Sequence, residues 1–428
     1  MWLSPKAEAG CRIEGGGVLA ELIRREWREL EGIYAHIAVV HGVTTRTIQN
    51  DFDAILMVLA ESGLLEMSEM EVEGEIREAK AMGIAGKNTG NFGNVMGFWK
   101  DNRIPAELHI DLTSACTERC VHCYYPEHQK QYLPFEVIGK ALREFRTMGG
   151  LTVHLTGGEC MLHPQFEPVC RLCVELDLNI IILSNLTLCE TERVAFLREI
   201  RPQFINVSLY SMDEAEHDAI TQVPRSWQRT IGAIEECERA GVAVRLAVPL
   251  LKGNRKAFPG LKRFAEEHGL HLVSDCTIVP QTNQDCSNLD HACSVAELEE
   301  TLRETPDIFD WGLGRRPIPG LDDRVCNIGE GRLCLNAEGN YYPCDGMHGF
   351  VLGNARQRTV AEIWHGEKLE ALRRLKNRDF DGCATCRHRS FCKVCPAFNF
   401  NATGNVLKTI PEKCAVSAVL HRVYGRAG

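Results

Sequence analysis

The middle of the chain alternates short apolar runs with longer amphipathic stretches. Six runs rich in β-branched residues predict strands, and stretches such as "SWQRTIGAIEECERAG" (226–241), with apolar residues at helical spacing, predict helices between them. Strands that alternate with helices predict parallel pairing, because each helical crossover returns the chain to the same end of the sheet. The predicted strands are "ELHIDLT" (107–113), "LTVHLTGG" (151–158), "NIIILSN" (179–185), "FINVSLY" (204–210), "VAVRLAVPL" (242–250) and "HLVSDCTIV" (271–279).

Six such β–α units predict an α/β fold, either an open doubly wound sheet or a barrel. Periodicity alone does not distinguish the two arrangements. In both, ligands bind at the carboxyl ends of the strands. The segment that follows the first predicted strand is therefore expected at the functional end of the sheet.

The first 90 residues have a different pattern. Two stretches, 18–42 and 43–67, have apolar residues at helical spacing, and Thr44 or Thr45 can cap the second. The layout resembles a winged-helix or helix-turn-helix module. These 90 residues carry nine Lys/Arg against fifteen Asp/Glu, so their surface is expected to repel DNA. A polar, glycine-containing stretch follows, and we assign the linker to 91–104.

Composition limits the class of protein. The chain has 428 residues, 44% of them hydrophobic, which is enough for two or three domains with ordinary cores. A net charge of −10 argues against a general nucleic-acid binder. No secretory signal opens the chain, and no apolar run approaches membrane-spanning length. We therefore expect a cytoplasmic protein with neither a nucleic-acid nor a membrane partner.

Twenty cysteines are many for a cytosolic chain, where metal ligation is a better expectation than disulfides. Three lie in "CTERCVHC" (116–123) and eight between residues 326 and 414. The other nine are scattered, and we expect them to be small buried hydrophobes.

The first three cysteines directly follow the first predicted strand. Thiolates at short spacing on one loop converge on a common centre, as a soft metal or an iron–sulfur cluster requires. A missing fourth ligand leaves a coordination position open. The alternative is a zinc knuckle with a fourth ligand from His122, Cys160 or elsewhere.

The gaps of three and two residues, the place after the first of six β–α units, and "TGGEC" after the second strand together resemble the radical S-adenosylmethionine (radical SAM) superfamily. The resemblance covers roughly residues 105–300 and implies a partial (β/α)6 TIM-like barrel. It implies a [4Fe–4S] cluster on Cys116, Cys120 and Cys123. The open iron would chelate S-adenosylmethionine, which is cleaved to methionine and a 5′-deoxyadenosyl radical.

The resemblance also assigns side chains to the cofactor. It implies an aromatic ring that lies against the adenine of S-adenosylmethionine. It also implies glycines beside a carboxylate that accepts hydrogen bonds from the ammonium group of the methionine part, and polar side chains that bind the ribose and the carboxylate of the cofactor. The corresponding residues are His122 for the ring, then Gly157, Gly158 and Glu159, then Ser208 and Arg229, with Ser184 and Asn185 as weaker candidates. Arg229 fits a solvated helix position equally well.

The eight C-terminal cysteines make two sets of four. A pair of zinc ribbons would use them as well. Behind a radical SAM domain, the series resembles a SPASM domain with two auxiliary [4Fe–4S] clusters, which makes three clusters in all. The two-residue gap between Cys392 and Cys395 departs from the usual three. The implied ligands are Cys326, Cys334, Cys344 and Cys395 for the first auxiliary cluster, and Cys383, Cys386, Cys392 and Cys414 for the second.

Asp345 follows Cys344 directly. In sulfatase-maturing relatives an aspartate at this place is proposed as the catalytic base, and we expect a carboxylate beside a cluster to have the raised pKa that this role needs. A loop aspartate that makes a turn in "CDG" is the alternative.

Together the three parts resemble maturases of ribosomally made peptides. The acidic N-terminal module is similar to the PqqD-like leader-recognition domain, so we expect domains at 1–90, 105–310 and 311–428. The partners would be a precursor peptide, bound through leader and core, and an electron donor such as flavodoxin or ferredoxin. The reaction would form a thioether or carbon–carbon crosslink after hydrogen abstraction.

Other functions stay open at this point. Sulfatase maturation, quinone-cofactor biosynthesis and mycofactocin-type peptide oxidation use similar cores. A protein of another class, a metal-dependent helix-turn-helix regulator, fits the first 90 residues.

Overall fold

The computed structural model describes residues 102–125, 128–309, 318–392 and 394–425, together with three short strands in the first 101 residues. These are β1 (Trp2–Pro5), β2 (Arg28–Glu29) and β3 (Leu65–Ser68), paired antiparallel in the order β2-β1-β3. Two of them correct the helix predictions, because β2 lies inside stretch 18–42 and β3 begins inside stretch 43–67. Both strands pair with β1, a distant partner that local periodicity does not reveal. The rest of the predicted winged helix lies outside the described residues.

All six predicted strands of the middle region are present. They are β4 (Glu107–Thr113), β5 (Thr152–Gly157), β6 (Asn179–Ser184), β7 (Phe204–Ser208), β8 (Val244–Pro249) and β9 (His271–Asp275). Each pairs in parallel with the next along the chain. This sequential order is that of a partial barrel, because a doubly wound sheet reverses its strand order part-way.

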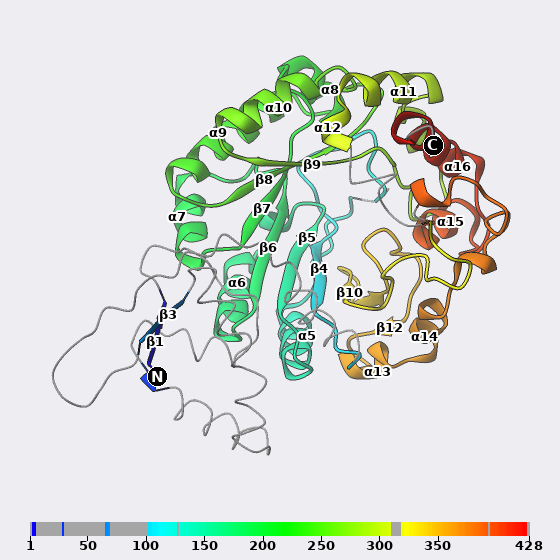
Figure 1. The fold of residues 1–428 in the computed structure, drawn as a ribbon. Helices are drawn as coiled ribbons and strands as arrows, with labels where there is room; N and C mark the ends of the chain where they lie inside the picture. The colour runs from blue at the N-terminus through cyan, green and yellow to red at the C-terminus, as the bar shows by residue number, and fades with distance from the viewer. Residues whose placement is uncertain are drawn as a thin grey trace.

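Helices follow the strands and cover the outer side of the curved sheet (Figure 1). The helix predicted at 226–241 is confirmed as α9 (Ser226–Arg239), whose Ala233, Ile234 and Cys237 are buried. Six of the seven residues of β4 are buried, as expected for a sheet that is covered on both faces. The other helices along the sheet are α5 (Phe135–Thr147), α6 (Phe166–Glu175), α7 (Thr191–Ile200), α8 (Glu214–Thr221), α10 (Phe258–Glu267), α11 (Val295–Glu304) and α12 (Pro306–Phe309).

The sheet continues beyond the six predicted strands. β10 (Arg332–Leu335) pairs in parallel with β4, and β11 (Asn340–Tyr342) and β12 (Gly353–Asn354) extend it antiparallel. β10 lies in the segment 311–428, so the sheet crosses the domain boundary that we expected near residue 310. The remaining helices are α13 (Val360–Trp364), α14 (Glu367–Arg373), α15 (Pro396–Thr403) and α16 (Pro411–Tyr424).

The C-terminal segment contacts both ends of the curved sheet. At one end β10 is hydrogen-bonded to β4. At the other, α16 packs against α11, and Arg422 Nη2 lies 2.9 Å from Glu299 Oε2. Figure 1 shows this segment, in yellow to red, on the open side of the barrel. No helix in the described ranges is long and apolar enough to cross a membrane.

Candidate cofactor and cluster site

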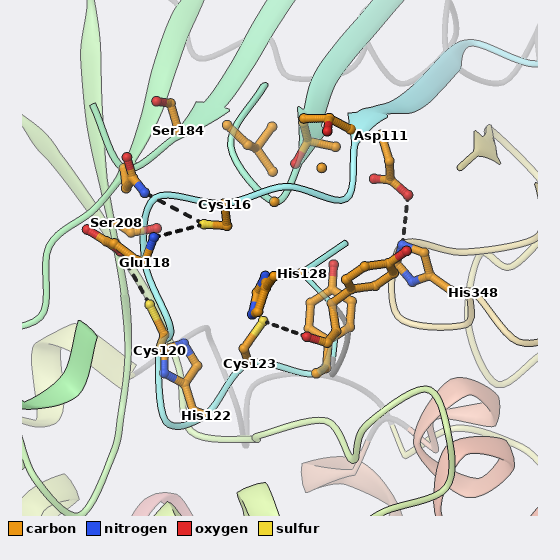
Figure 2. Close-up of a pocket in the computed structure, with 18 of the residues that line it drawn as sticks. Asp111, Cys116, Glu118, Cys120, His122, Cys123, His128, Ser184, Ser208 and His348 are labelled. Carbon is orange, nitrogen blue, oxygen red and sulfur yellow. Dashed lines mark hydrogen bonds and ion pairs between the residues drawn. The ribbon is translucent and has the colours of Figure 1, made fainter. Parts of the chain in front are cut away.

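A cavity of about 210 Å³ lies at the carboxyl ends of the parallel strands. Figure 2 shows the loop after β4 on one side of it and His348, from the C-terminal segment, on the other. Nine of the residues that the sequence singled out line it: Cys116, Cys120, His122, Cys123, Gly157, Gly158, Ser184, Asn185 and Ser208. These residues thus come together around one cavity at the carboxyl ends of the strands.

The three thiols of the loop lie in a setting that disfavours free thiolates. Burial raises the pKa of Cys116 to about 12 and also raises the pKa of Cys120 and Cys123. Thiolates here need a compensating cation. Within the described residues, no group of three or more His, Cys, Asp or Glu side chains has the spacing of a single metal ion. A four-iron cluster holds its thiolates farther apart, since each binds a different iron, so the donor set suits a cluster better than zinc.

Two glycines allow β4 and β5 to approach each other beside the thiols. A Cβ on Gly157 would meet the carbonyl oxygen of Thr113, and Gly157 also has φ +127°. A Cβ on Gly158 would meet the carbonyl oxygen of Ala115 and lie 2.9 Å from the Cβ of Cys116. The close approach leaves room for a ligand only because both residues lack a side chain.

Glu159 is fully buried and does not line the cavity. Its carboxylate accepts hydrogen bonds from Ser184 Oγ at 2.9 Å, the backbone N–H of Asn185 at 2.9 Å and that of Met161 at 3.0 Å. Burial raises the pKa of Glu159 even though these donors oppose the shift. In this structure the carboxylate fixes the end of β6 rather than facing a ligand.

His122, on the loop after β4, and Ser208, at the end of β7, both line the cavity. The ring of His122 meets Tyr210 edge-on, with centroids 5.2 Å apart. Burial lowers the pKa of His122 to about 4, so the ring is neutral and apolar enough to stack on a base. Its Nδ1 is buried and has no hydrogen-bond partner in the described part of the chain.

Arg229 is exposed on α9 and does not line the cavity. It acts on Glu118, a cavity residue that the sequence did not single out. Burial raises the pKa of Glu118 to about 7, and the charge of Arg229 partly opposes that rise. The sequence indicated Glu118 only by placing an acidic residue between two predicted cluster ligands in "CTERC".

A second missed group joins the barrel to the C-terminal segment. Asp111, on β4, accepts hydrogen bonds from Tyr342 Oη at 2.6 Å and from His348 Nε2 at 2.8 Å. All three side chains are buried. Burial alone would raise the pKa of Asp111, but its interactions with His348, His109 and Tyr342 together outweigh burial and lower the pKa. The sequence indicated Asp111 only by the presence of polar residues within the predicted buried strand "ELHIDLT".

The C-terminal thiols fall into two neighbourhoods by their mutual electrostatics. Burial and the charge of Asp345 raise the pKa of Cys334 and of Cys344, and Cys344 adds to the rise at Cys334 as Cys395 does at Cys344. In the same way, Cys392, Cys386 and Cys414 raise the pKa of Cys383. Cys395 is thus close to Cys344, although it is only three residues from Cys392.

Asp345 differs from the expectation of a raised pKa. Its Oδ2 lies 3.0 Å from Arg332 Nη1, and Cys344 Sγ donates a hydrogen bond to Oδ1 at 3.1 Å. Burial raises the pKa of Asp345, but the positive charges of His109 and Arg332 and this hydrogen bond bring it to about 2. An aspartate held ionised beside an arginine is a weak base, so the predicted property is wrong.

Comparison with known proteins agrees with this layout. Residues 110–265 match the profile of the Radical SAM superfamily, and residues 326–388 match that of the SPASM iron–sulfur cluster-binding domain. The chain therefore contains a radical SAM domain followed by a SPASM domain. The SPASM match ends before Cys392, Cys395 and Cys414.

Individual relatives differ in their chemistry. The chain is 24% identical to an AdoMet-dependent heme synthase of Methanosarcina barkeri, over 72% of this chain and 95% of the relative. It is 23% identical to a PqqA peptide cyclase of Granulibacter bethesdensis, over 74% and 89%. The structure of Streptococcus suis SuiB bound to its precursor peptide SuiA has a similar fold, with a TM-score of 0.61, 16% identity and coverage of 91% and 94%.

Proposed function

We propose that this protein is a radical SAM enzyme that modifies a ribosomally made precursor peptide. The observation that carries the proposal is the shared cavity, with the three-thiol loop on one wall and the SPASM residue His348 on another. A reduced [4Fe–4S] cluster with bound S-adenosylmethionine supplies a 5′-deoxyadenosyl radical. Residues from both domains then surround the place where that radical meets the substrate.

The residues of the chain would hold the cofactor in definite ways. Cys116, Cys120 and Cys123 would hold the cluster, which explains three thiols kept together in a setting that disfavours them as free thiolates. Neutral His122 would lie against the adenine, and Ser208 would bind the ribose. Glu159 acts indirectly, because it orders Ser184 and Asn185 at the cavity wall.

The C-terminal thiols would hold two auxiliary clusters. The closeness of Cys334, Cys344 and Cys395, and of Cys383 with its three neighbours, supports the crossed order of ligands. Thiolate-ligated clusters conduct electrons, so they would carry away the electron that an oxidative crosslink releases. Flavodoxin or ferredoxin would reduce the cluster held by Cys116, Cys120 and Cys123, and the reaction would take place in the cytoplasm.

A peptide substrate is supported by two relatives. PqqA peptide cyclase is named for a peptide, and SuiB was solved with its precursor SuiA. We propose a thioether or carbon–carbon crosslink as the product, and recognition of the leader by a PqqD-like module within residues 1–90.

Heme synthesis is a second candidate, favoured by the match that spans 95% of the heme synthase. The two candidate functions differ in which substrate is consumed when S-adenosylmethionine is cleaved. A peptide that contains the crosslink loses two mass units, whereas a porphyrin changes its visible spectrum.

The test combines reconstituted, reduced enzyme and S-adenosylmethionine with the peptide from the small open reading frame beside this chain's gene. Formation of 5′-deoxyadenosine together with a peptide lighter by two mass units supports the proposal. Cofactor cleavage with no change in the peptide, and turnover of an iron porphyrin instead, overturns it in favour of heme synthesis.

A further inference from the structure

His348 lies at the wall of the cofactor cavity but comes from the SPASM domain. Its side chain is 6% exposed, and Nε2 lies 2.8 Å from Asp111 Oδ2. The ring stacks on Tyr342, with centroids 4.3 Å apart, and Tyr342 Oη donates to the same Asp111 oxygen. The imidazole is thus held in one orientation by a carboxylate and an aromatic ring.

The two nitrogens of this ring have different surroundings. Nε2 faces an ionised carboxylate, so it carries the hydrogen in the neutral ring and donates it to Asp111. Nδ1 is buried and lacks a hydrogen-bond partner among the described side chains and backbone. A buried nitrogen lone pair without a donor is costly unless something else supplies the donor. A substrate in the adjoining cavity is the group that would do so.

We propose that His348 is the catalytic base of this enzyme and that Nδ1 takes a proton from the substrate. The proposal rests on the peptide-modifying function proposed above. The step is a heterolytic proton transfer: the N–H bond forms on Nδ1, the substrate X–H bond breaks, and its electron pair stays on X. The Asp111 carboxylate then neutralises the imidazolium, and no electron is exchanged in this step.

The chemistry of imidazole narrows the substrate group. A thiol, with a pKa about two units above that of imidazole, transfers its proton readily, whereas an aliphatic hydroxyl does not. His348 therefore suits a cysteine side chain in the core peptide, which favours a thioether over a carbon–carbon product.

Asp345 is the competing base. Its carboxylate is already ion-paired to Arg332, and it does not line the cavity. His348 lines the cavity and has an unpaired acceptor. The groups that contact its ring are Asp111 on β4, Tyr124 and Tyr125 after it, and Tyr342 on β11. His109 Nε2 lies 3.7 Å from Asp111 Oδ1, and His128 lines the same cavity.

The test compares His348→Gln with His163→Gln, using the recombinant peptide from the adjoining open reading frame. His163 is also buried, but it bonds the backbone oxygen of Leu133 away from the cavity. We expect His348→Gln to lower the crosslinks formed per 5′-deoxyadenosine by about 100-fold or more, the range of general-base catalysis. The pH profile of the crosslinking rate is also compared, and we expect the profiles of the wild type and of His348→Gln to differ. An unchanged ratio and pH profile overturns the role of His348.

The outcomes separate this inference from the proposed function. If the wild type cleaves S-adenosylmethionine but crosslinks no peptide, the proposed function fails. If it crosslinks the peptide and His348→Gln does so equally, only the inference about His348 fails.

Discussion

Arg332 and Asp345 form an ion pair beside Cys344, with Nη1 3.0 Å from Oδ2. The same guanidinium reaches across to β4, where its Nη2 lies 2.6 Å from Glu107 Oε2. One arginine thus neutralises two carboxylates at the junction of the barrel and the SPASM domain.

Replacement of Arg332 with Gln is expected to destabilise this junction. Glu107 and Asp345 would lose their counterion while they remain partly buried, and we expect the free energy of unfolding to fall by about 1–2 kcal/mol. Urea denaturation of the cluster-free protein measures the effect. Arg171→Gln, which removes a surface ion pair with Glu199, is the control and is expected to stay near the wild type. Equal stability of the two variants would contradict the bridging role.

The iron content tests the assignment of the eleven cysteines. Three [4Fe–4S] clusters correspond to about twelve irons per chain after anaerobic reconstitution. Replacement of Cys116, Cys120 and Cys123 together with Ala is expected to leave about eight irons and to abolish cleavage of S-adenosylmethionine. Iron and zinc analysis decides the count. Two zinc ions with only four irons would show that the C-terminal cysteines form zinc ribbons.

Gly158 tests the close approach of the two strands beside the thiols. Gly158→Ala places a Cβ against the carbonyl oxygen of Ala115 and the Cβ of Cys116, so the loop must move. We expect at least a tenfold weaker S-adenosylmethionine affinity, measured by equilibrium dialysis on reconstituted protein. Gly232→Ala, in α9 where the new methyl meets no atom within 4 Å, is the control. It is expected to raise stability by about 0.5–1 kcal/mol and leave affinity unchanged. Unchanged affinity in Gly158→Ala would be incompatible with a cofactor seated there.

His217 links stability to pH. It is fully buried, and burial lowers its pKa to about 4 from an ordinary 6.5. Between pH 6.5 and pH 4 the His217 ring is protonated in the unfolded chain but neutral in the folded chain. The free energy of unfolding therefore decreases as the pH falls from about 6.5 to 4. The loss is roughly 3 kcal/mol at most for this group. Denaturation of wild type and His217→Gln at pH 7 and pH 4.5 is expected to show a smaller loss in the variant. An equal loss would mean that the ring is charged in the folded protein.

Deletion of residues 1–90 tests leader recognition. The thiol loop and its glycines lie beyond residue 105, so cofactor cleavage without peptide is expected to persist. Crosslinking of the full precursor is expected to fall sharply, because the module raises the local concentration of the core peptide. Kinetics with leader-bearing and leaderless peptides measure the effect, and a DNA titration at several salt concentrations tests the regulator alternative. Crosslinking at the wild-type rate would remove the leader-binding role.

Sequence reasoning recovered the strands and the thiol loop because both depend on local pattern. A short run of β-branched residues such as "NIIILSN" predicts a buried strand. The spacing of Cys116, Cys120 and Cys123 within eight residues is enough to indicate the thiol loop. It missed the pairing of β10 with β4 and the contact of Asp111 with His348. These depend on residues more than 200 positions apart, which no local period encodes. It also misjudged the pKa of Asp345, because the ion pair with Arg332 on β10 forms only in the folded chain.

The long-range pairing of β4 also sets the order in which the barrel is completed. β5 to β9 can each pair with the preceding strand as the chain leaves the ribosome. The other edge of β4 stays unpaired until β10 has been synthesised, and β10 begins at Arg332, 225 residues after Glu107. At ribosomal rates this interval is roughly 10 to 45 s. During this interval the unpaired edge of β4 is open to other nascent chains, so intermolecular strand addition competes with folding until the C-terminal segment has been synthesised.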